Sequence, residues 1–289
     1  MTNKTPAPKS RQSGRPSSPG VTENPWDHLR AFTDARIGLG RAGISLPTSK
    51  MLEFQLAHAQ AQDAVHLPLD VPELCDQLAA LDAFTGSAAP LVLQTQVSDR
   101  ITYLQRPDLG RRLDEASRGR LEGVAPPSGE AFDLAIVVVD GLSSLAVQNN
   151  ASPFVTALMQ ELADDTTGPW HVAPLTVVEQ GRVAIGDEVG EVLNAKAVLV
   201  LIGERPGLSS PDSLGLYLTW GPHPGLTDAA RNCISNVRPA GLSSVHASRR
   251  MLYLLRESHK QKLSGVKLKD RTEDDVIEHQ QEGGNFLTS

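Results

Sequence analysis

Two short, fully apolar runs constrain the fold of this chain more than any other feature of its sequence. Residues 134–139 read Leu-Ala-Ile-Val-Val-Val, β-branched at four of six positions, and residues 197–202 read Ala-Val-Leu-Val-Leu-Ile. Asp133 and Asp140 bound the first run. Strands of a parallel sheet that is covered on both faces are apolar throughout, whereas half-exposed strands alternate. The two runs therefore predict central strands of a sheet with helices on both faces.

Amphipathic segments separate these runs from further strand-like stretches. Further strands are expected at residues 91–94, 172–178 and 214–220. Helices are expected at residues 107–116, 155–162, 185–193 and 245–263. Strands that alternate with helices are typical of parallel βαβ units. The sequence therefore predicts an α/β fold, a doubly wound, mostly parallel sheet with an N-terminal helical region.

Composition divides the chain into four parts. Residues 1–22 are Pro, Ser, Gly, Lys and Arg without apolar pattern, and residues 266–289 are polar and charged. Both are expected to be solvated tails. Residues 23–90 have helical spacing, with helices expected from Thr48 to about Val65 and from Pro72 onwards. Residues 91–265 are expected to form the α/β domain.

Charge, hydropathy and cysteine content exclude several classes of protein. Among 289 residues there are 27 Lys and Arg against 34 Asp and Glu, a formal net charge of −7, whereas a dedicated nucleic-acid-binding protein usually has a basic face. No apolar stretch reaches the ~20 residues of a membrane span, and no secretory signal is evident. Cys75 and Cys233 cannot build a disulfide framework. A soluble, cytosolic protein with reduced thiols is expected.

The segment Gly38–Gly43 matches the dinucleotide-binding pattern G-x-G-x-x-G. That pattern binds pyrophosphate when a strand precedes it and a helix follows at once. Here a helical pattern precedes it, and Ile44-Ser45-Leu46-Pro47 follows. A tight loop between helices is the favoured interpretation.

Two predicted strands end in polar residues that could form a site. Glu204 and Arg205 follow the run 197–203, and ligands of open α/β sheets bind beyond the carboxyl ends of strands. This pair either binds a polar ligand or forms a surface ion pair that shapes a loop. Asp140 also follows a strand, before Gly141 and two serines. It is either catalytic or part of a tight turn in which a serine caps the next helix.

Other candidates carry weaker signals. Cys233 could be a reactive thiol beside Arg231, but a small buried thiol is the simpler interpretation. The eight histidines show no metal-ligand spacing, so no metal site is predicted. Arg100, Arg106, Arg111 and Arg112 form a basic cluster that is either a phosphate or protein contact or a solvated helix start. From the residues alone, no reaction follows.

Five stretches together carry a resemblance to a known family. They are Ala35–Gly43, Ser98–Leu113, Val139–Ser144, Gly181–Leu208 and Arg231–Asn236, and they span the chain from about residue 30 to 265. In their motifs and order the chain resembles the small (light) subunit of ethanolamine ammonia-lyase, an adenosylcobalamin enzyme. The resemblance implies a helical N-terminal part and a Rossmann-like C-terminal domain.

The resemblance also implies corrinoid contacts at Val183, Glu204 and Cys233. A carboxylate at a strand end could accept hydrogen bonds from the corrin's amide side chains. Cys233, expected in a loop after the last strand, could pack against the ring as a soft apolar group. The pattern D-x-H-x-x-G, with which other corrinoid enzymes supply a protein histidine to cobalt, is missing, so a base-on cofactor is expected.

The implied reaction converts ethanolamine to acetaldehyde and ammonia by a radical mechanism. The implied partner is the large barrel subunit, in a hetero-oligomer of several large–small pairs with the corrinoid between the two subunits. Because substrate and radical residues belong to the large subunit in this family, no catalytic residue is assigned to this chain. The family's N-terminus can direct a bacterial microcompartment location through an amphipathic helix, but residues 1–22 have almost no apolar residues.

Two alternatives remain open at this point. One is a stand-alone nucleotide-dependent α/β enzyme that uses the Gly38–Gly43 loop. The other is a non-catalytic adaptor whose sheet is only an interaction surface. The adaptor predicts that loss of Glu204 leaves cofactor affinity unchanged.

Overall fold

The computed structural model describes residues 24–269 except residues 25, 34, 82, 84–88 and 128. The expected N-terminal tail, residues 1–22, and residues 270–289 of the expected C-terminal tail lie outside this part. The chain divides into two compact units, and the boundary between them lies between Gln60 and Ala61. Each unit is described by itself.

The N-terminal unit contains the 3-10 helix η1 (Asp27–Ala31) and most of α1 (Thr48–His66), with the glycine motif between them. Gly38, Gly40 and Gly43 all have positive φ, and a Cβ on Gly38 would lie 2.7 Å from the Trp26 carbonyl oxygen. The motif is therefore a loop between helices, as predicted, and within the described residues no strand precedes it.

The second unit contains a six-stranded sheet of order β1-β3-β2-β4-β5-β6. The strands are β1 (Leu91–Gln94), β2 (Phe132–Val139), β3 (Thr176–Glu179), β4 (Ala195–Gly203), β5 (Leu214–Trp220) and β6 (Arg231–Val237). The pairings β1–β3, β3–β2 and β2–β4 are parallel, whereas β4–β5 and β5–β6 are antiparallel. The predicted α/β fold with a mostly parallel sheet is confirmed.

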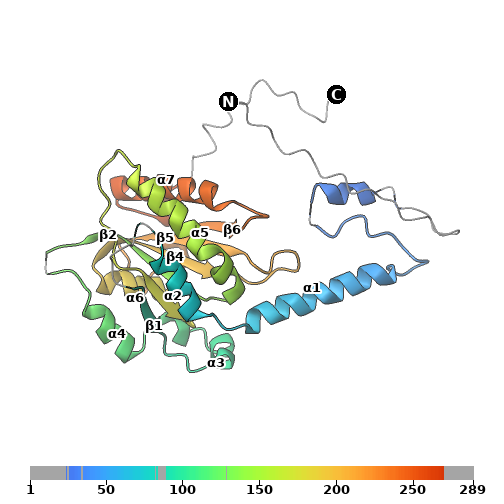
Figure 1. Ribbon diagram of the computed structural model, residues 1–289, viewed down its shortest axis with the longest axis horizontal. Coiled ribbons are helices and arrows are strands. Elements are labelled where there is room, and N and C mark those ends of the chain that lie inside the picture. Colours follow the sequence, from blue (N-terminus) through green and yellow to red (C-terminus); the bar gives the residue numbers. More distant parts are fainter. Residues whose placement is uncertain are drawn as a thin grey trace, which may run out of the picture. The chain divides into compact units, whose positions relative to one another are not determined.

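Helices cover both faces of the sheet (Figure 1). On one face, α2 (Val71–Ala79), α5 (Ser144–Ala163) and α7 (Ser244–Gln261) pack in one hydrophobic core. On the other face lie α4 (Glu115–Glu122) and α6 (Ile185–Val192). Residues 134–139 of β2 alternate between the two cores and are all buried. Double coverage is the reason for the continuous apolar run in the sequence.

The end of the sheet differs from the simple βαβ alternation predicted from the sequence. Residues 204–213 connect β4 to β5 without a helix, and a parallel crossover usually needs a dozen or more residues. The strand at 214–220 is therefore present but antiparallel to β4. The expectation that Cys233 lies in a loop is wrong, because it lies inside β6. This edge strand has an exposed face, so it lacks the apolar run that marks β2 and β4.

The prediction of a helix at residues 107–116 is also wrong. The segment instead follows α3 (Arg100–Gln105) and contains the 3-10 helix η3 (Leu109–Arg111) and the start of α4. Two aspartates begin the helices: Asp99 accepts a hydrogen bond from Thr102 N, and Asp114 accepts one from Ser117 N. Aspartate is a favoured residue at the N-cap position of a helix. Two such caps 15 residues apart therefore indicate two short helices rather than one.

The packed unit reaches beyond residues 91–265 at both ends. Leu74 and Leu78 of α2 are fully buried in the core of α5 and α7, although the sequence groups this helix with the N-terminal region. At the other end, the 3-10 helix η5 (Gly265–Lys267) is followed by Leu268, which is also buried in that core. Asn232 donates to the Leu268 carbonyl oxygen at 2.9 Å.

None of the helices in the described residues is both long and apolar enough to cross a membrane. Within the same residues, no group of three or more His, Cys, Asp or Glu side chains is placed to hold a metal ion.

A buried ion pair links β6 to α6. Removing it tests whether this contact stabilises the fold. Arg231 donates to both carboxylate oxygens of Asp187 at 2.6 and 2.7 Å, and both side chains are almost completely buried. Asp187→Ala should lower the free energy of unfolding by about 3–5 kcal/mol, because it leaves a buried guanidinium without its counter-charge. Urea denaturation measures the change.

The matched control is Asp228→Ala. Asp228 also contacts Arg231, at 3.4 Å, but its side chain is almost completely exposed. This variant should unfold at nearly the wild-type urea concentration. Equal losses for the two variants would contradict the assignment of the Asp187–Arg231 pair as the structural contact.

Candidate functional site

The loops that follow β2, β3 and β4 meet at the carboxyl ends of these strands and line a cavity of about 400 Å³. The residues that line it are Tyr103, Leu142, Arg182, Val183, Ile202, Gly203, Glu204, Arg205 and Tyr217. The polar crevice predicted at the strand ends is therefore present. Two of the three site residues predicted from the family resemblance, Val183 and Glu204, lie in its wall.

Glu204 is held in place by hydrogen bonds from two later segments of the chain. Its carboxylate accepts from Ser213 Oγ just before β5, from Ser235 Oγ at 2.5 Å and from Asn236 N at 3.2 Å in β6. Its own backbone N donates to Ser213 O at 2.9 Å. Glu204 therefore cross-links the end of β4 to β6 and does not form the surface pair with Arg205 that the sequence left open.

Cys233 lies next to the cavity but not in its lining. It faces Tyr217 across the β5–β6 pair, and Tyr217 lines the cavity. Although Cys233 as a residue is exposed, partial desolvation of the sulfur and the nearby Glu204 carboxylate raise the pKa of its thiol. A thiol with a raised pKa is mostly protonated at neutral pH, which suits a packing contact rather than a nucleophile.

Val183 lies in the turn between β3 and α6. It is half-buried and packs against the core under α6. The preceding residue, Arg182, places its guanidinium over the ring of Tyr103 at 4.0 Å and donates from Nη2 to Tyr103 O at 2.8 Å. Its Nε is buried without a hydrogen-bond partner. Sequence reasoning missed Arg182, Tyr103 and Tyr217, and the only available signal was that Arg182 directly precedes Val183.

Asp140 connects two of the loops that line the cavity without lining the cavity itself. Its side chain is 3% exposed, and its Oδ1 accepts from Gly141 N at 2.8 Å and from Gly181 N at 3.2 Å. Arg100 lies with Nη1 3.6 Å from Oδ2. Desolvation raises the pKa of Asp140 to about 6, although Arg100 and the backbone donors oppose the shift. Of the two alternatives left open, the tight turn is the one that is present.

The helix cap after this turn is Ser143, whose Oγ accepts from Ala146 N at 3.2 Å, so a serine does begin α5. The predicted basic cluster of Arg100, Arg106, Arg111 and Arg112 does not act as one group. Arg100 is directed to Asp140, whereas Arg106 forms an exposed ion pair with Asp108. Asp140 does not line the cavity, so its role is to hold backbone rather than to contact a ligand.

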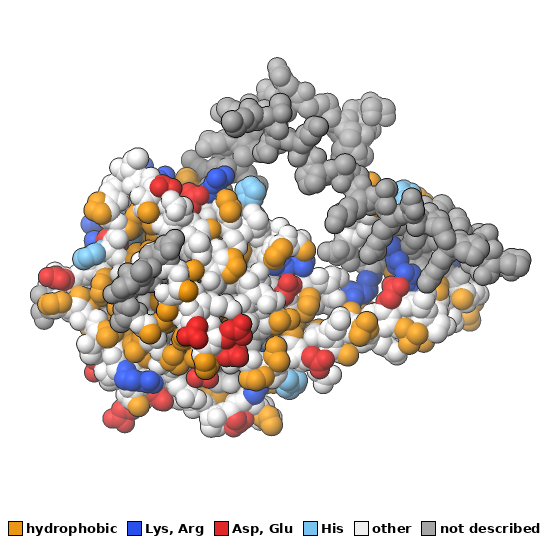
Figure 2. Space-filling view, viewed as in Figure 1, with side chains coloured by type: hydrophobic (Ala, Val, Ile, Leu, Met, Phe, Trp, Pro, Cys, Tyr) orange, Lys and Arg blue, Asp and Glu red, His pale blue; other side chains and the backbone are white. Residues whose placement is uncertain are grey.

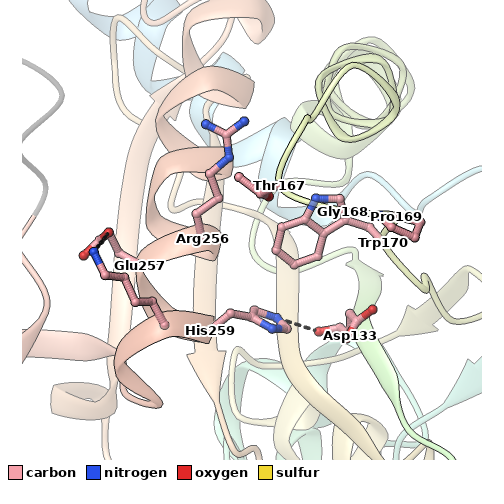
Figure 3. Close-up of a pocket in the computed structure, with 9 residues that line it drawn as sticks. Asp133, Thr167, Gly168, Pro169, Trp170, Arg256, Glu257 and His259 are labelled. Atoms are coloured by element: carbon pink, nitrogen blue, oxygen red, sulfur yellow. Dashed lines mark hydrogen bonds and ion pairs between the residues drawn. The ribbon is translucent and has the colours of Figure 1, made fainter.

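A second cavity, of about 560 Å³, lies at the amino ends of β2 and β4 (Figure 3). Its charged side chains are paired: Arg256 with Asp165 at 2.7 Å, and Lys260 with Glu257 at 3.6 Å. His259 Nε2 lies 3.1 Å from Asp133 O, and desolvation lowers its pKa. None of the predicted site residues lies here, and the paired charges fit a structural role.

Asp140→Asn should change the pH dependence of folding. Because the pKa of Asp140 in the native chain is about 6 against 3.8 for an unburied aspartate, the native chain keeps a proton that the unfolded chain has already lost. Relative to the variant, the wild type should therefore lose about 3 kcal/mol of unfolding free energy as the pH rises from about 4 to about 7. Urea unfolding at several pH values checks this, and a constant difference would contradict it.

Comparisons with known proteins agree with the resemblance seen in the sequence. The family model for the ethanolamine ammonia-lyase light chain (EutC) matches residues 23–269. A relative from Azotobacter vinelandii named ethanolamine ammonia-lyase small subunit is 55% identical over 270 residues, which cover 92% of this chain and 96% of the relative. A relative of the same name from Pseudomonas aeruginosa strain UCBPP-PA14 is 55% identical, with 92% of this chain and 94% of the relative covered. Another, from Pseudomonas putida strain W619, is 54% identical, with 92% of this chain and 96% of the relative covered. The chain therefore belongs to the ethanolamine ammonia-lyase light-chain family.

Proposed function

We propose that this chain is the small subunit of an adenosylcobalamin-dependent ethanolamine ammonia-lyase and that it holds the corrinoid at its interface with the large subunit. The observation that carries the proposal is the cavity at the carboxyl ends of β2, β3 and β4. Val183 and Glu204 lie in its wall, and Cys233 lies behind Tyr217 at its edge.

The cavity's size favours a shared site. Its volume is about 400 Å³, whereas pockets of about 300–1,000 Å³ already serve drug-sized ligands that are much smaller than cobalamin. Only part of the cofactor could enter it, so the rest would lie outside this cavity, where a second chain could cover it. A corrinoid held between two subunits fits this arrangement.

The polar groups at the cavity fit the cofactor's chemistry. The Glu204 carboxylate receives three hydrogen bonds but has about four acceptor positions, so one position is available for an amide of the corrin. Arg182 has a buried Nε without a partner, and Arg205 is exposed at the mouth. Two guanidinium groups suit the phosphodiester of a base-on cobalamin. The missing D-x-H-x-x-G pattern agrees with the base-on form.

When bound, the cofactor supplies the radical that begins the conversion of ethanolamine to acetaldehyde and ammonia. This chain's residues bind and orient it: Glu204 accepts hydrogen bonds, Val183 and Cys233 offer apolar contact, and the walls exclude water. Substrate binding and radical transfer are assigned to the large subunit, and no catalytic residue is proposed in this chain.

The N-terminal unit supports a protein partner. Nine of the fifteen large apolar side chains that are exposed in the described residues lie between Trp26 and Leu56. Apolar side chains line the surface of α1 (Figure 2). Concentrated apolar exposure of this kind marks an interaction surface, and we assign it to the large subunit in a hetero-oligomer of several large–small pairs. A cytoplasmic location, inside or outside a bacterial microcompartment, fits this role.

The two alternatives have less support. A stand-alone nucleotide enzyme would need the Gly38–Gly43 loop after a strand, and it lies between η1 and α1 instead. A non-catalytic adaptor gives no reason for a glutamate with a spare acceptor position and an unpartnered arginine Nε at one cavity.

The decisive test of this function is co-expression of the chain with a large subunit. Acetaldehyde formation from ethanolamine and adenosylcobalamin should require both chains, and the two should elute together in size exclusion. Full turnover by the large subunit alone would overturn the proposal.

Glu204→Gln should weaken binding of adenosylcobalamin to the assembled enzyme by about tenfold or more, because a charge-assisted hydrogen bond contributes about 1.5–3 kcal/mol. Titration followed by visible absorption measures the dissociation constant. Glu257→Gln is the control, since Glu257 lines the second cavity at the other end of the sheet. Unchanged affinity of the Glu204 variant in an intact complex would reject this site and favour the adaptor.

Exposed apolar residues of α1 should be needed for assembly. Leu52 and Leu56 are 57% and 60% exposed. Their joint replacement by serine should reduce co-elution with the large subunit, because it removes apolar area from the interface without opening a buried core. A double serine variant at the exposed Val245 and Val266 of the α/β unit is the control. Normal co-elution of the α1 variant would place the interface elsewhere.

A further inference from the structure

The turn Gly181–Val183 carries Arg182 and Val183 into the wall of the strand-end cavity, and two buried side chains hold its first residue. Gly181 N donates to Asp140 Oδ1 at 3.2 Å, and Gly181 O accepts from the Tyr103 hydroxyl at 3.0 Å. Asp140 is 3% exposed and Tyr103 is fully buried. Both backbone polar groups of one residue are thus bound by side chains that do not belong to the turn.

We propose that Asp140 and Tyr103 are positioning residues for cofactor binding, which set the turn Gly181–Val183 at the distance from the loop after β2 that the cofactor requires. The proposal rests on the proposed function, since it assumes that the cavity receives the corrinoid. It adds two residues, one from the loop after β2 and one from α3, to the three contact positions implied by the family resemblance.

Asp140 couples two segments that contribute to the wall of the cavity. The same oxygen that accepts from Gly181 N also accepts from Gly141 N at 2.8 Å, and Leu142 next to it lines the cavity. Arg100 donates to Gly141 O at 2.9 Å and lies beside the second carboxylate oxygen. One carboxylate therefore fixes the spacing between the loop after β2 and the turn after β3.

Tyr103 fixes the side chain as well as the backbone of the turn. Its ring lies under the Arg182 guanidinium at 4.0 Å and under that of Arg100 at 4.6 Å, and its carbonyl oxygen accepts from Arg182 Nη2. Arg182 N donates to Gly110 O at 2.8 Å. With these contacts made, Arg182 Nε remains as the donor without a partner. Cation–π contact with a desolvated ring orients the guanidinium more firmly than a solvated contact would.

The turn cannot relax toward the sheet when a support is lost. A Cβ on Gly181 would lie 2.5 Å from Val139 Cγ1, so the backbone already touches β2. Gly110 is also close on the other side, where a Cβ would lie 3.0 Å from Arg182 Cγ. Loss of a support should therefore move the turn outward, into the cavity that the cofactor needs.

The charged and titratable groups around Asp140 are Arg100 and Tyr103 from α3 and Arg182 from the turn. Protonation of Asp140 leaves Arg100 without its counter-charge and weakens the acceptor for both backbone N–H groups. Binding of the cofactor should therefore weaken as the pH falls through about 6. An asparagine at this position cannot show that dependence.

The test uses the co-expressed two-subunit enzyme with adenosylcobalamin as the probe. Tyr103→Phe removes only the hydroxyl that binds Gly181 O, and Asp140→Asn removes only the charge. Each should raise the dissociation constant of the cofactor about three- to tenfold. Because Tyr103 lines the cavity and Asp140 holds the turn beside it, the readout is the dissociation constant of the cofactor rather than turnover.

The pH dependence of cofactor binding separates a positioning role from a merely structural one, because a structural role would leave that dependence unchanged. The ratio of the Asp140→Asn dissociation constant to that of the wild type should shrink as the pH falls below about 6, because the wild type loses the charge that the variant lacks. Tyr253→Phe, on α7 at the other face of the sheet, is the control and should bind the cofactor as the wild type does.

The outcomes separate this proposal from the proposed function. If Glu204→Gln weakens cofactor binding but Tyr103→Phe and Asp140→Asn do not, the positioning role is overturned and the site stands. If none of the three variants changes the affinity, the cavity is not the cofactor site and both proposals fail. Should Asp140→Asn fail to assemble, Tyr103→Phe still decides, because it keeps the ring and both cation–π contacts.

Discussion

The contact between the backbone at Gly141 and the backbone at Gly203 is the constraint on which the rest of the site depends. A Cβ on Gly141 would overlap the carbonyl oxygen of Gly203, and a Cβ on Gly203 would overlap that of Ser143. Leu142 N donates to Gly203 O at 2.9 Å. Because neither position leaves room for a side chain, the loops after two neighbouring parallel strands touch directly. Glu204 therefore leaves β4 at the edge of the cavity.

The antiparallel half of the sheet gives that glutamate its partners. The short connection from β4 turns the chain back into β5, and β6 follows antiparallel to β5. This places Ser235 and Asn236 within hydrogen-bond distance of the Glu204 carboxylate, and Cys233 opposite Tyr217. A purely parallel sheet would carry the chain after β4 through a helix and away from this edge. The departure from simple alternation is therefore what assembles the proposed corrinoid contacts.

The two ends of the sheet have different polar chemistry. At the amino ends, Asp165 and Arg256 pair with each other, and His259 lies between the rings of Trp170 and Trp220. At the carboxyl ends, Arg182 retains a donor without a partner. A buried donor without a partner is costly unless a ligand or water satisfies it, so of the two cavities in the described residues the one at the carboxyl ends has the reason to bind a ligand. The corrinoid contacts that we propose lie at this same edge.

The sequence by itself determined the buried strands β2 and β4, the helices that begin at Thr48 and near Pro72, the loop character of Gly38–Gly43 and membership of the family. These features depend on local patterns of hydrophobicity, caps and glycines, or on motifs that can be read along the chain. Only the tertiary structure decided that β5 and β6 are antiparallel, that Cys233 lies in a strand, and that Asp140 and Tyr103 share Gly181. Those contacts join residues 41 and 78 positions apart, and no local pattern encodes a hydrogen bond across such a separation, because its formation depends on which strands become neighbours.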